Sequence, residues 1–110
     1  MKHWKELLDE MYEGFREYTE KTGIEVKIIQ VKEKFGSLRV YLEEHSNILD
    51  AIIYRAWVKS TRICGDCGST EGVELDTRGW WTYRCAECRT NYGQENKRIP
   101  EETPLSPNQI

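Results

Sequence analysis

Two pairs of cysteines decide the fold: CGDC at residues 64–67 and CAEC at residues 85–88. Residues 68–84 separate the pairs, a distance that falls within the spacing of zinc sites with four cysteine ligands. Each C-x2-C pair can curl its backbone so that both sulfurs face one point, and Gly65 and Gly68 supply the torsional freedom that a tight turn needs. The sequence therefore predicts one structural zinc ion, bound by Cys64, Cys67, Cys85 and Cys88.

Two other roles of cysteine compete with zinc binding. Disulfides need an oxidising compartment, and residues 1–10 mix charged with apolar side chains and lack the apolar core of a signal peptide. A redox-active C-x2-C pair usually follows a strand in a βαβ unit, and two such pairs together fit metal coordination better. We therefore expect a cytoplasmic protein whose zinc, with four thiolates, has no open position for catalysis.

The residues between the two pairs predict a β-hairpin. Val73 and Leu75 alternate with polar residues, Gly79 marks a turn, and residues 80–83 (WWTY) form a β-prone run. A hairpin between two cysteine turns is a zinc ribbon. If residues 88–92 begin a helical turn, the unit is closer to a treble clef, and the sequence leaves both forms open.

The N-terminal half predicts two helices. Residues 4–22 have apolar side chains at steps of three and four, which mark one face of a helix, and Gly23 suits a left-handed cap at its end. A second helix is expected from Ser46 or Asn47 onward, because either side chain can accept a hydrogen bond from a first-turn amide.

Two antiparallel strands are predicted between these helices. Residues 24–28 and 38–42 alternate apolar and polar side chains, and the short connection 32–37 contains a glycine, which favours a hairpin. The fold class is therefore α+β, with the helices covering one side of the strands. A two-stranded sheet is marginal by itself, so we expect pairing with strands of the metal-binding segment or with another copy of the chain.

The chain of 110 residues divides into three parts. Residues 1–61 form the helix-hairpin-helix layer, and residues 62–93 form the four-cysteine zinc unit. Residues 94–110 are polar and hold all three prolines, so we expect a flexible, extended tail.

One order of motifs resembles a known group of proteins. The segment 31–41, VKEKFGSLRVY, precedes the first cysteine pair, and Gly79-Trp80 precedes the second. This order resembles small uncharacterised proteins of bacteria and their phages, in which a K-F-G-x-L-R-x-Y segment is followed by a C-x2-C…C-x2-C zinc ribbon. The resemblance covers residues 31–92. It implies the zinc site and an origin in a mobile genetic element, and it implies no reaction.

Two sets of aromatic and cationic residues are candidate partner-binding surfaces. Aromatic residues and arginine are the usual anchors of interfaces, and since adjacent strand residues face opposite ways, one of the two tryptophans can reach solvent. Burial of both tryptophans over the zinc turns is the alternative. At the hairpin tip we favour a solvated loop with Phe35 folded inward. The first set is Arg78, Trp80, Trp81, Tyr83 and Arg84, and the second is Lys32, Lys34, Phe35 and Arg39.

Charge and motif content limit the function. Sixteen Lys and Arg stand against nineteen Asp and Glu, which disfavours binding to nucleic acid. His3 and His45 are isolated, and no catalytic constellation is visible. We therefore expect a non-enzymatic module that inhibits or adapts a host protein, as small phage proteins do with the defence or transcription machinery. A nucleic-acid-binding zinc ribbon is the alternative, an enzyme with an unrecognised site is the third class, no membrane contact is expected, and a homo-oligomer is left open.

Replacing Cys64 or Cys85 by Ser should lower the zinc content and the melting temperature together. The two losses are coupled because the free energy of metal binding is also folding free energy. Elemental analysis of protein purified without chelator measures the metal, with about one zinc per chain expected in the wild type, and circular dichroism measures the melting. A fully folded, metal-free wild type with its thiols oxidised in pairs would contradict the zinc site.

Overall fold

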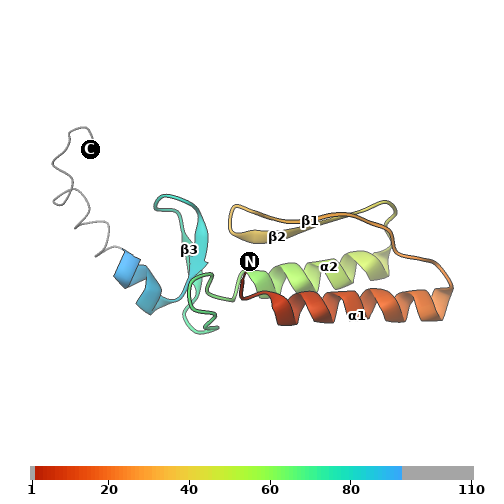
Figure 1. Cartoon of the computed structure of the whole chain (residues 1–110), viewed down its shortest axis with the longest axis horizontal. Coiled ribbons are helices and arrows are strands. Elements are labelled where there is room, and N and C mark those ends of the chain that lie inside the picture. The colour runs from red at the N-terminus through yellow and green to blue at the C-terminus, as the bar shows by residue number, and fades with distance from the viewer. Residues whose placement is uncertain (1, 93–110) are drawn as a thin grey trace.

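The computed structural model describes residues 2–92, and in these the chain forms a helix, a hairpin, a second helix and a second, smaller hairpin (Figure 1). Residues 86–92 add a helical segment after the last strand. The α+β class is therefore confirmed, whereas the predicted tail at 94–110 lies outside the described residues. The elements are α1 (Lys5–Thr22), β1 (Ile28–Lys34), β2 (Ser37–Leu42), α2 (Asn47–Ser60), β3 (Glu74–Asp76) and β4 (Thr82–Arg84).

Both long helices begin or end where the local sequence predicts. Gly23 follows α1 with a φ of 74°, and its N–H donates to the carbonyl of Thr19. This left-handed conformation is easy for glycine and closes the helix. At the start of α2, Ser46 is the cap, because its Oγ accepts a hydrogen bond from the N–H of Leu49 at 3.2 Å. Asn47 is the first residue of the helix.

The first hairpin begins later along the chain than the sequence pattern predicts. Residues 24–27 precede β1, so the predicted strand at 24–28 is wrong except for its last residue. The turn sets this register, because Phe35 and Gly36 both have positive φ, 55° and 84°. Such a two-residue turn matches the twist of the flanking strands. It pairs Lys34 with Ser37 and carries β1 up to the turn itself.

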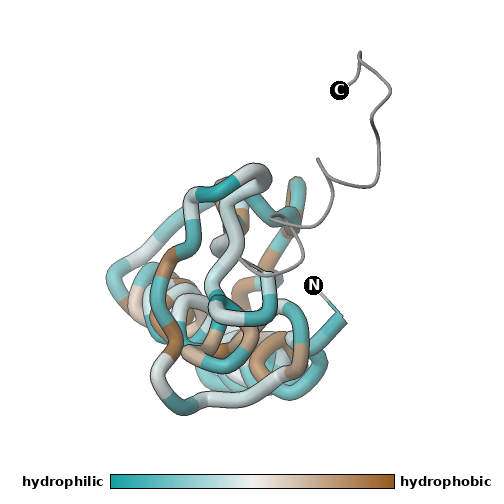
Figure 2. The backbone as a smooth tube through the Cα atoms, turned by 90° about the vertical axis from the view of Figure 1, so that its left-hand side faces the viewer, coloured by the Kyte–Doolittle hydropathy of each residue, from teal (hydrophilic) through white to brown (hydrophobic). Residues whose placement is uncertain are grey.

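The core lies between the first hairpin and the two helices. Leu38, Val40 and Leu42 alternate along β2 and enter one buried cluster with residues of both helices. Figure 1 shows the hairpin running along the helix pair, with its tip toward the cysteine-bearing region. Along the backbone tube, hydrophobic and hydrophilic residues are interspersed, as amphipathic elements require (Figure 2). The cluster comprises Trp4, Leu7, Met11, Phe15, Leu38, Val40, Leu42, Leu49 and Ala56.

The two hairpins form separate sheets. Within the described residues, β1 pairs only with β2, and β3 pairs only with β4. The expected pairing of the first hairpin with strands of the metal-binding segment is therefore wrong. The hairpin instead gains its stability from the helices that cover one face, which removes apolar surface from water without further strand pairing.

Ser60 joins α2 to the outer edge of β2. It is 1 % exposed, its Oγ accepts a hydrogen bond from the N–H of Leu38 at 3.1 Å, and it donates to the carbonyl of Trp57. A serine at the last turn of the helix thereby satisfies a strand amide that has no partner in the sheet. Leaving such a buried donor unpaired costs about 1–3 kcal/mol.

We expect Ser60→Ala to lower the free energy of unfolding by about 1–3 kcal/mol, because the buried N–H of Leu38 loses its acceptor. Thr61→Ala is the matched control, since the Thr61 hydroxyl only donates to the carbonyl of Val58 within the end of the helix. Urea unfolding of the two variants measures the difference. Equal losses in both variants would show that the Leu38 contact does not matter.

Candidate metal centre

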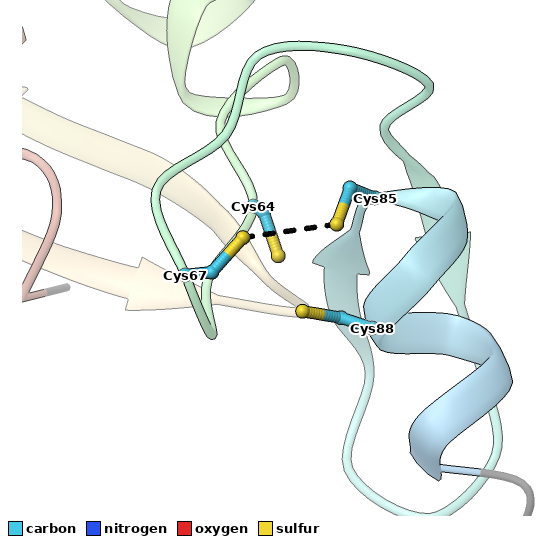
Figure 3. A group of neighbouring side chains, drawn as sticks. All are labelled: Cys64, Cys67, Cys85 and Cys88. Atoms are coloured by element: carbon cyan, nitrogen blue, oxygen red, sulfur yellow. Dashed lines mark hydrogen bonds between the residues drawn. The ribbon is translucent and has the colours of Figure 1, made fainter.

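The four cysteines converge on one point, as predicted. Cys64 and Cys67 come from the loop after α2, and Cys85 and Cys88 come from the start of the helical segment, with their sulfurs turned toward one another (Figure 3). All four Sγ atoms lie within 4.8 Å of one another, and those of Cys67 and Cys85 are 3.7 Å apart. Four thiolates around a tetrahedral ion with bonds of about 2.3 Å have sulfurs about 3.8 Å apart. The cluster therefore has the size of a metal site.

The first cysteine pair is shaped by backbone hydrogen bonds. The N–H of Gly68 donates to the carbonyl of Cys64 at 2.9 Å, and the N–H of Cys64 donates to Ser69 at 2.8 Å. Gly68 has a φ of 84°, which a residue with a side chain rarely adopts. Gly65 is required because a side chain lacks space at this position: a Cβ there would lie 2.8 Å from Cγ2 of Thr82. Both glycines are therefore needed for the turn.

The second cysteine pair lies on the helical segment. Residues 86–92 are helical, and the N–H of Arg89 donates to the carbonyl of Cys85 at 2.9 Å. A turn, a hairpin and a helix that begins between the last two ligands match the treble clef more closely than the ribbon. The sequence left this choice open, since a short helix next to a hairpin has no separate hydrophobic pattern.

The four thiols differ in how readily they ionise. Burial raises the pKa of the Cys64 thiol, but backbone hydrogen bonds from Cys85, Cys67 and Asp66 outweigh burial and lower that pKa to about 6. Burial and the other three sulfurs raise the pKa of the Cys88 thiol well above its ordinary value. All four cysteines are free thiols. A cation among them offsets the mutual repulsion of thiolates, and binding it releases protons.

Arg84 fastens the first cysteine pair to the second hairpin. Its side chain is 9 % exposed, its Nε donates to Oδ2 of Asp66 at 2.7 Å, and its Nη1 lies 3.2 Å from Oδ2 of Asp76. Asp66 lies between the first two cysteines, so this ion pair holds their turn against β4. Arg84 was predicted to lie on the partner surface, and its burial between two carboxylates places it inside the molecule instead.

Asp76 is the centre of this ionic network. It is buried with 3 % of its side chain exposed, and it accepts hydrogen bonds from Nε and Nη2 of Arg78 at 2.9 and 2.7 Å. Arg78 thereby holds the pKa of Asp76 well below its usual range. Two guanidinium groups on one buried carboxylate satisfy charges that would otherwise be costly to bury.

Tyr92 closes the network from the helical segment. The guanidinium carbons of Arg84 and Arg78 lie 4.3 and 5.1 Å from the centre of its ring, within the range of cation–π attraction. Gly79 makes room for it, because a Cβ at that position would lie 2.5 Å from the Tyr92 hydroxyl. The second hairpin and the helical segment are thus joined by contacts other than the metal site.

The sequence did not predict roles for Asp66, Asp76 or Tyr92. One signal for Asp76 was available, because its carboxylate also accepts from the N–H of Arg78 two residues later, at 3.1 Å. Aspartate is favoured at the start of turns for this reason. The pairing of Asp66 with Arg84 joins two segments distant in sequence, and no local pattern indicates it.

Three aromatic residues lie exposed where the two hairpins meet. Trp80 is 78 %, Phe35 57 % and Trp81 43 % exposed. The rings of Phe35 and Trp81 are 5.4 Å apart at an angle of 50°, so the tip of the first hairpin rests against the start of β4. The favoured inward position of Phe35 is therefore wrong, and so is the burial of the tryptophans. We call Phe35, Trp80 and Trp81 the aromatic surface.

Of the other predicted surface residues, Lys34 lies next to the aromatic surface. Lys34 Nζ is 5.7 Å from the ring centre of Phe35, and Lys32 Nζ is 5.6 Å from that of Tyr41. Arg39 is half-buried, and so is Tyr83. Arg78 is exposed but engaged by Asp76. The histidines stand apart from one another, since His3 contacts the carbonyl of Asp66 and His45 contacts Asp50.

Comparison of the chain with known protein families, with curated proteins and with solved structures finds no match. Of the helices in the described residues, none has both the length and the apolar character needed to cross a lipid bilayer.

We expect Asp76→Asn to lower the free energy of unfolding by at least about 2 kcal/mol, because Arg84 is left buried with one carboxylate partner fewer. Glu74→Gln is the matched control on the same strand, since Glu74 is 75 % exposed and lies 3.8 Å from Arg89. Exposed pairs of this kind contribute roughly 0–1 kcal/mol. Thermal and urea unfolding of metal-loaded protein compare the variants, and a loss in Asp76→Asn no larger than in the control would show that the network does not stabilise the fold.

Proposed function

We propose that this chain is a zinc-stabilised protein-binding module without catalytic activity of its own. Zinc fits the donor set, because four thiolate sulfurs in tetrahedral arrangement are typical of structural zinc and of iron–sulfur centres. Zinc needs no inorganic sulfide and no redox partner. With Cys64, Cys67, Cys85 and Cys88 as ligands, its coordination shell is complete, and the ion supplies stability alone.

The observation that carries the proposal is the contact between Phe35 and Trp81. Phe35 lies in the turn of the first hairpin and Trp81 directly precedes β4 of the second, so the contact joins two separate hairpins beside the highly exposed Trp80. Exposed large aromatic residues are expensive to leave in water, and clusters of them mark interaction sites. Trp80 does little for the fold in this position, so its exposure fits a role in binding.

The class of partner is inferred from the net charge of the chain and from the resemblance of residues 31–92 to small phage proteins. The chain has a net charge of -3, which weakens general attraction to nucleic acid and favours a protein partner. The resemblance of residues 31–92 to small phage proteins supports a host protein of the defence or transcription machinery as the target. Inhibition or adaptation of such a protein requires a surface and no catalytic group.

We expect the tagged wild type to co-purify with one stoichiometric host protein, and Trp80→Ala to lose that protein. Because Trp80 is 78 % exposed, the variant should keep its metal and lie within about 0.5 kcal/mol of the wild type in stability. Tyr54→Ala is the matched control, since Tyr54 is 64 % exposed on α2, away from the aromatic surface. Quantitative mass spectrometry of the captured proteins measures the result. Capture that survives Trp80→Ala and Phe35→Ala would argue against the aromatic surface.

Nucleic-acid binding is the second candidate, favoured by one observation. Lys32 and Lys34 lie beside exposed aromatic rings, and cations with stacked aromatic residues are typical of surfaces that bind single strands. This function requires affinity that falls steeply with salt. A flat response between about 50 and 200 mM salt would exclude it.

A further inference from the structure

The outer face of the first hairpin carries positive charge only. Leu38, Val40 and Leu42 face the core, so their neighbours Arg39 and Tyr41 lie on the opposite face. The register places Lys32 directly opposite Arg39 and Gln30 opposite Tyr41. Like charges directly opposite one another destabilise a sheet. The pairing of Lys32 with Arg39 therefore destabilises the free hairpin. An anionic group of a binding partner, placed between these two side chains, would remove that repulsion.

The cations of this face have no carboxylate partner in the part of the chain that the structure describes. Lys32, Lys34 and Arg39 form none of the ion pairs found there. The Nε of Arg39 is shielded from solvent and has no hydrogen-bond acceptor among these residues. Buried donors are nearly always paired. Within the described residues, the outer face therefore has three positive charges without a carboxylate partner, two of them over aromatic rings, and one donor without an acceptor.

No strand of the described residues pairs with the outer edge of β1, which lies beside this face. The edge of β2 is occupied, because the N–H of Leu38 donates to Ser60 on α2. In an antiparallel pair, the backbone N–H and C=O groups of two opposite residues either bond to each other or point away from each other. The backbone groups of Leu38 point away from β1, so those of its partner Glu33 point away from β2. The same holds for Val31, two residues earlier. The backbone N–H and C=O groups of Val31 and Glu33 thus face the free edge.

Exposed apolar side chains lie at the start of β1. Ile29 is 67 % and Ile28 40 % exposed, although β-branched residues are normally at least half-buried in a sheet. An exposed edge strand with such residues is a template for pairing with another chain. A nucleic acid has no backbone that continues a β-ladder, whereas an extended peptide does.

We propose that the first hairpin binds an extended acidic segment of a partner protein, added as a third strand along β1. The backbone of the segment pairs with Val31 and Glu33, and alternate carboxylates lie over Lys32, Lys34 and Arg39. This inference deepens the proposed function and rests on it, because it names the chemistry of the partner. The aromatic surface adjoins the same hairpin tip and anchors the apolar part of the partner.

A short peptide of alternating Glu and Thr residues is the probe. Added to zinc-loaded wild type, it should shift the amide resonances of Val31 and Glu33, and it should slow hydrogen exchange at these two positions more than at Lys32. The same peptide N-methylated at alternate bonds should have no effect, because it cannot complete the ladder. A peptide of alternating Lys and Thr should not bind.

Lys32→Gln with Lys34→Gln should weaken binding of the acidic peptide by about tenfold, as two exposed ion pairs predict. Lys2→Gln with Lys21→Gln is the matched control, because it removes the same charge from exposed residues outside the hairpin and should leave binding unchanged. Melting curves and zinc content of both double variants show that each is folded. Equal weakening in the two double variants would mean attraction to net charge alone and would overturn the inference.

Three further results would also overturn it. These are no resonance shifts with the acidic peptide, equal binding of the N-methylated peptide, and tighter binding of oligo(dT) than of the acidic peptide at the same salt. The last result would assign the face to nucleic acid. The proposed function is tested separately, since capture of a host protein that depends on Trp80 but not on Lys32 and Lys34 would leave that function in place while the acidic segment is wrong.

Discussion

Four thiols that face one point repel one another when they ionise, and a cation is what makes the arrangement favourable. The sulfurs of Cys85, Cys64 and Cys67 help to raise the pKa of Cys88, while backbone N–H groups favour the thiolate of Cys64. The site is therefore set up to exchange protons for a metal ion. Because the cysteines come from both ends of residues 64–88, an ion bound there would close a loop whose own strands are only three residues long.

The ionic network around Arg84 also stabilises this loop. Arg84 contacts Asp66 in the first cysteine turn and Asp76 on β3, and its guanidinium lies over Tyr92 of the helical segment. These contacts connect every part of the metal-binding region without using a sulfur. The network favours one arrangement of these segments, because moving any of them would leave the buried Asp76 or Arg84 with fewer charged partners. A metal bound by the four cysteines would therefore hold the same segments that the network joins.

The surface that we propose for binding depends on both halves of the chain. Trp81 precedes β4, which the metal-binding region positions, and Phe35 lies in the turn of the first hairpin, which the helical core positions. Phe35 also has a positive φ of 55°, a conformation that costs a non-glycine residue about 1–2 kcal/mol. The contact with Trp81 offsets part of this cost. Loss of the metal would therefore disturb the aromatic surface as well as the fold.

Local patterns in the sequence were sufficient for the two long helices and for the four clustered cysteines. Each of these patterns acts over a few residues, so it can be recognised without knowing which distant segment packs against it. The patterns are the helical periodicity, the Gly23 cap, the Ser46 cap and the two C-x2-C pairs. The position of β1 follows from the turn at Phe35 and Gly36, in which Phe35 has a positive φ that is uncommon for a non-glycine residue. The burial of Arg84, the exposure of Phe35 and the separation of the two sheets were decided by tertiary structure. Each depends on which distant segment lies alongside: Ser60 at the edge of β2, Asp66 and Asp76 around Arg84, and Trp81 against the hairpin turn. Contacts between residues far apart in the chain leave no periodic trace, and only the folded chain shows them.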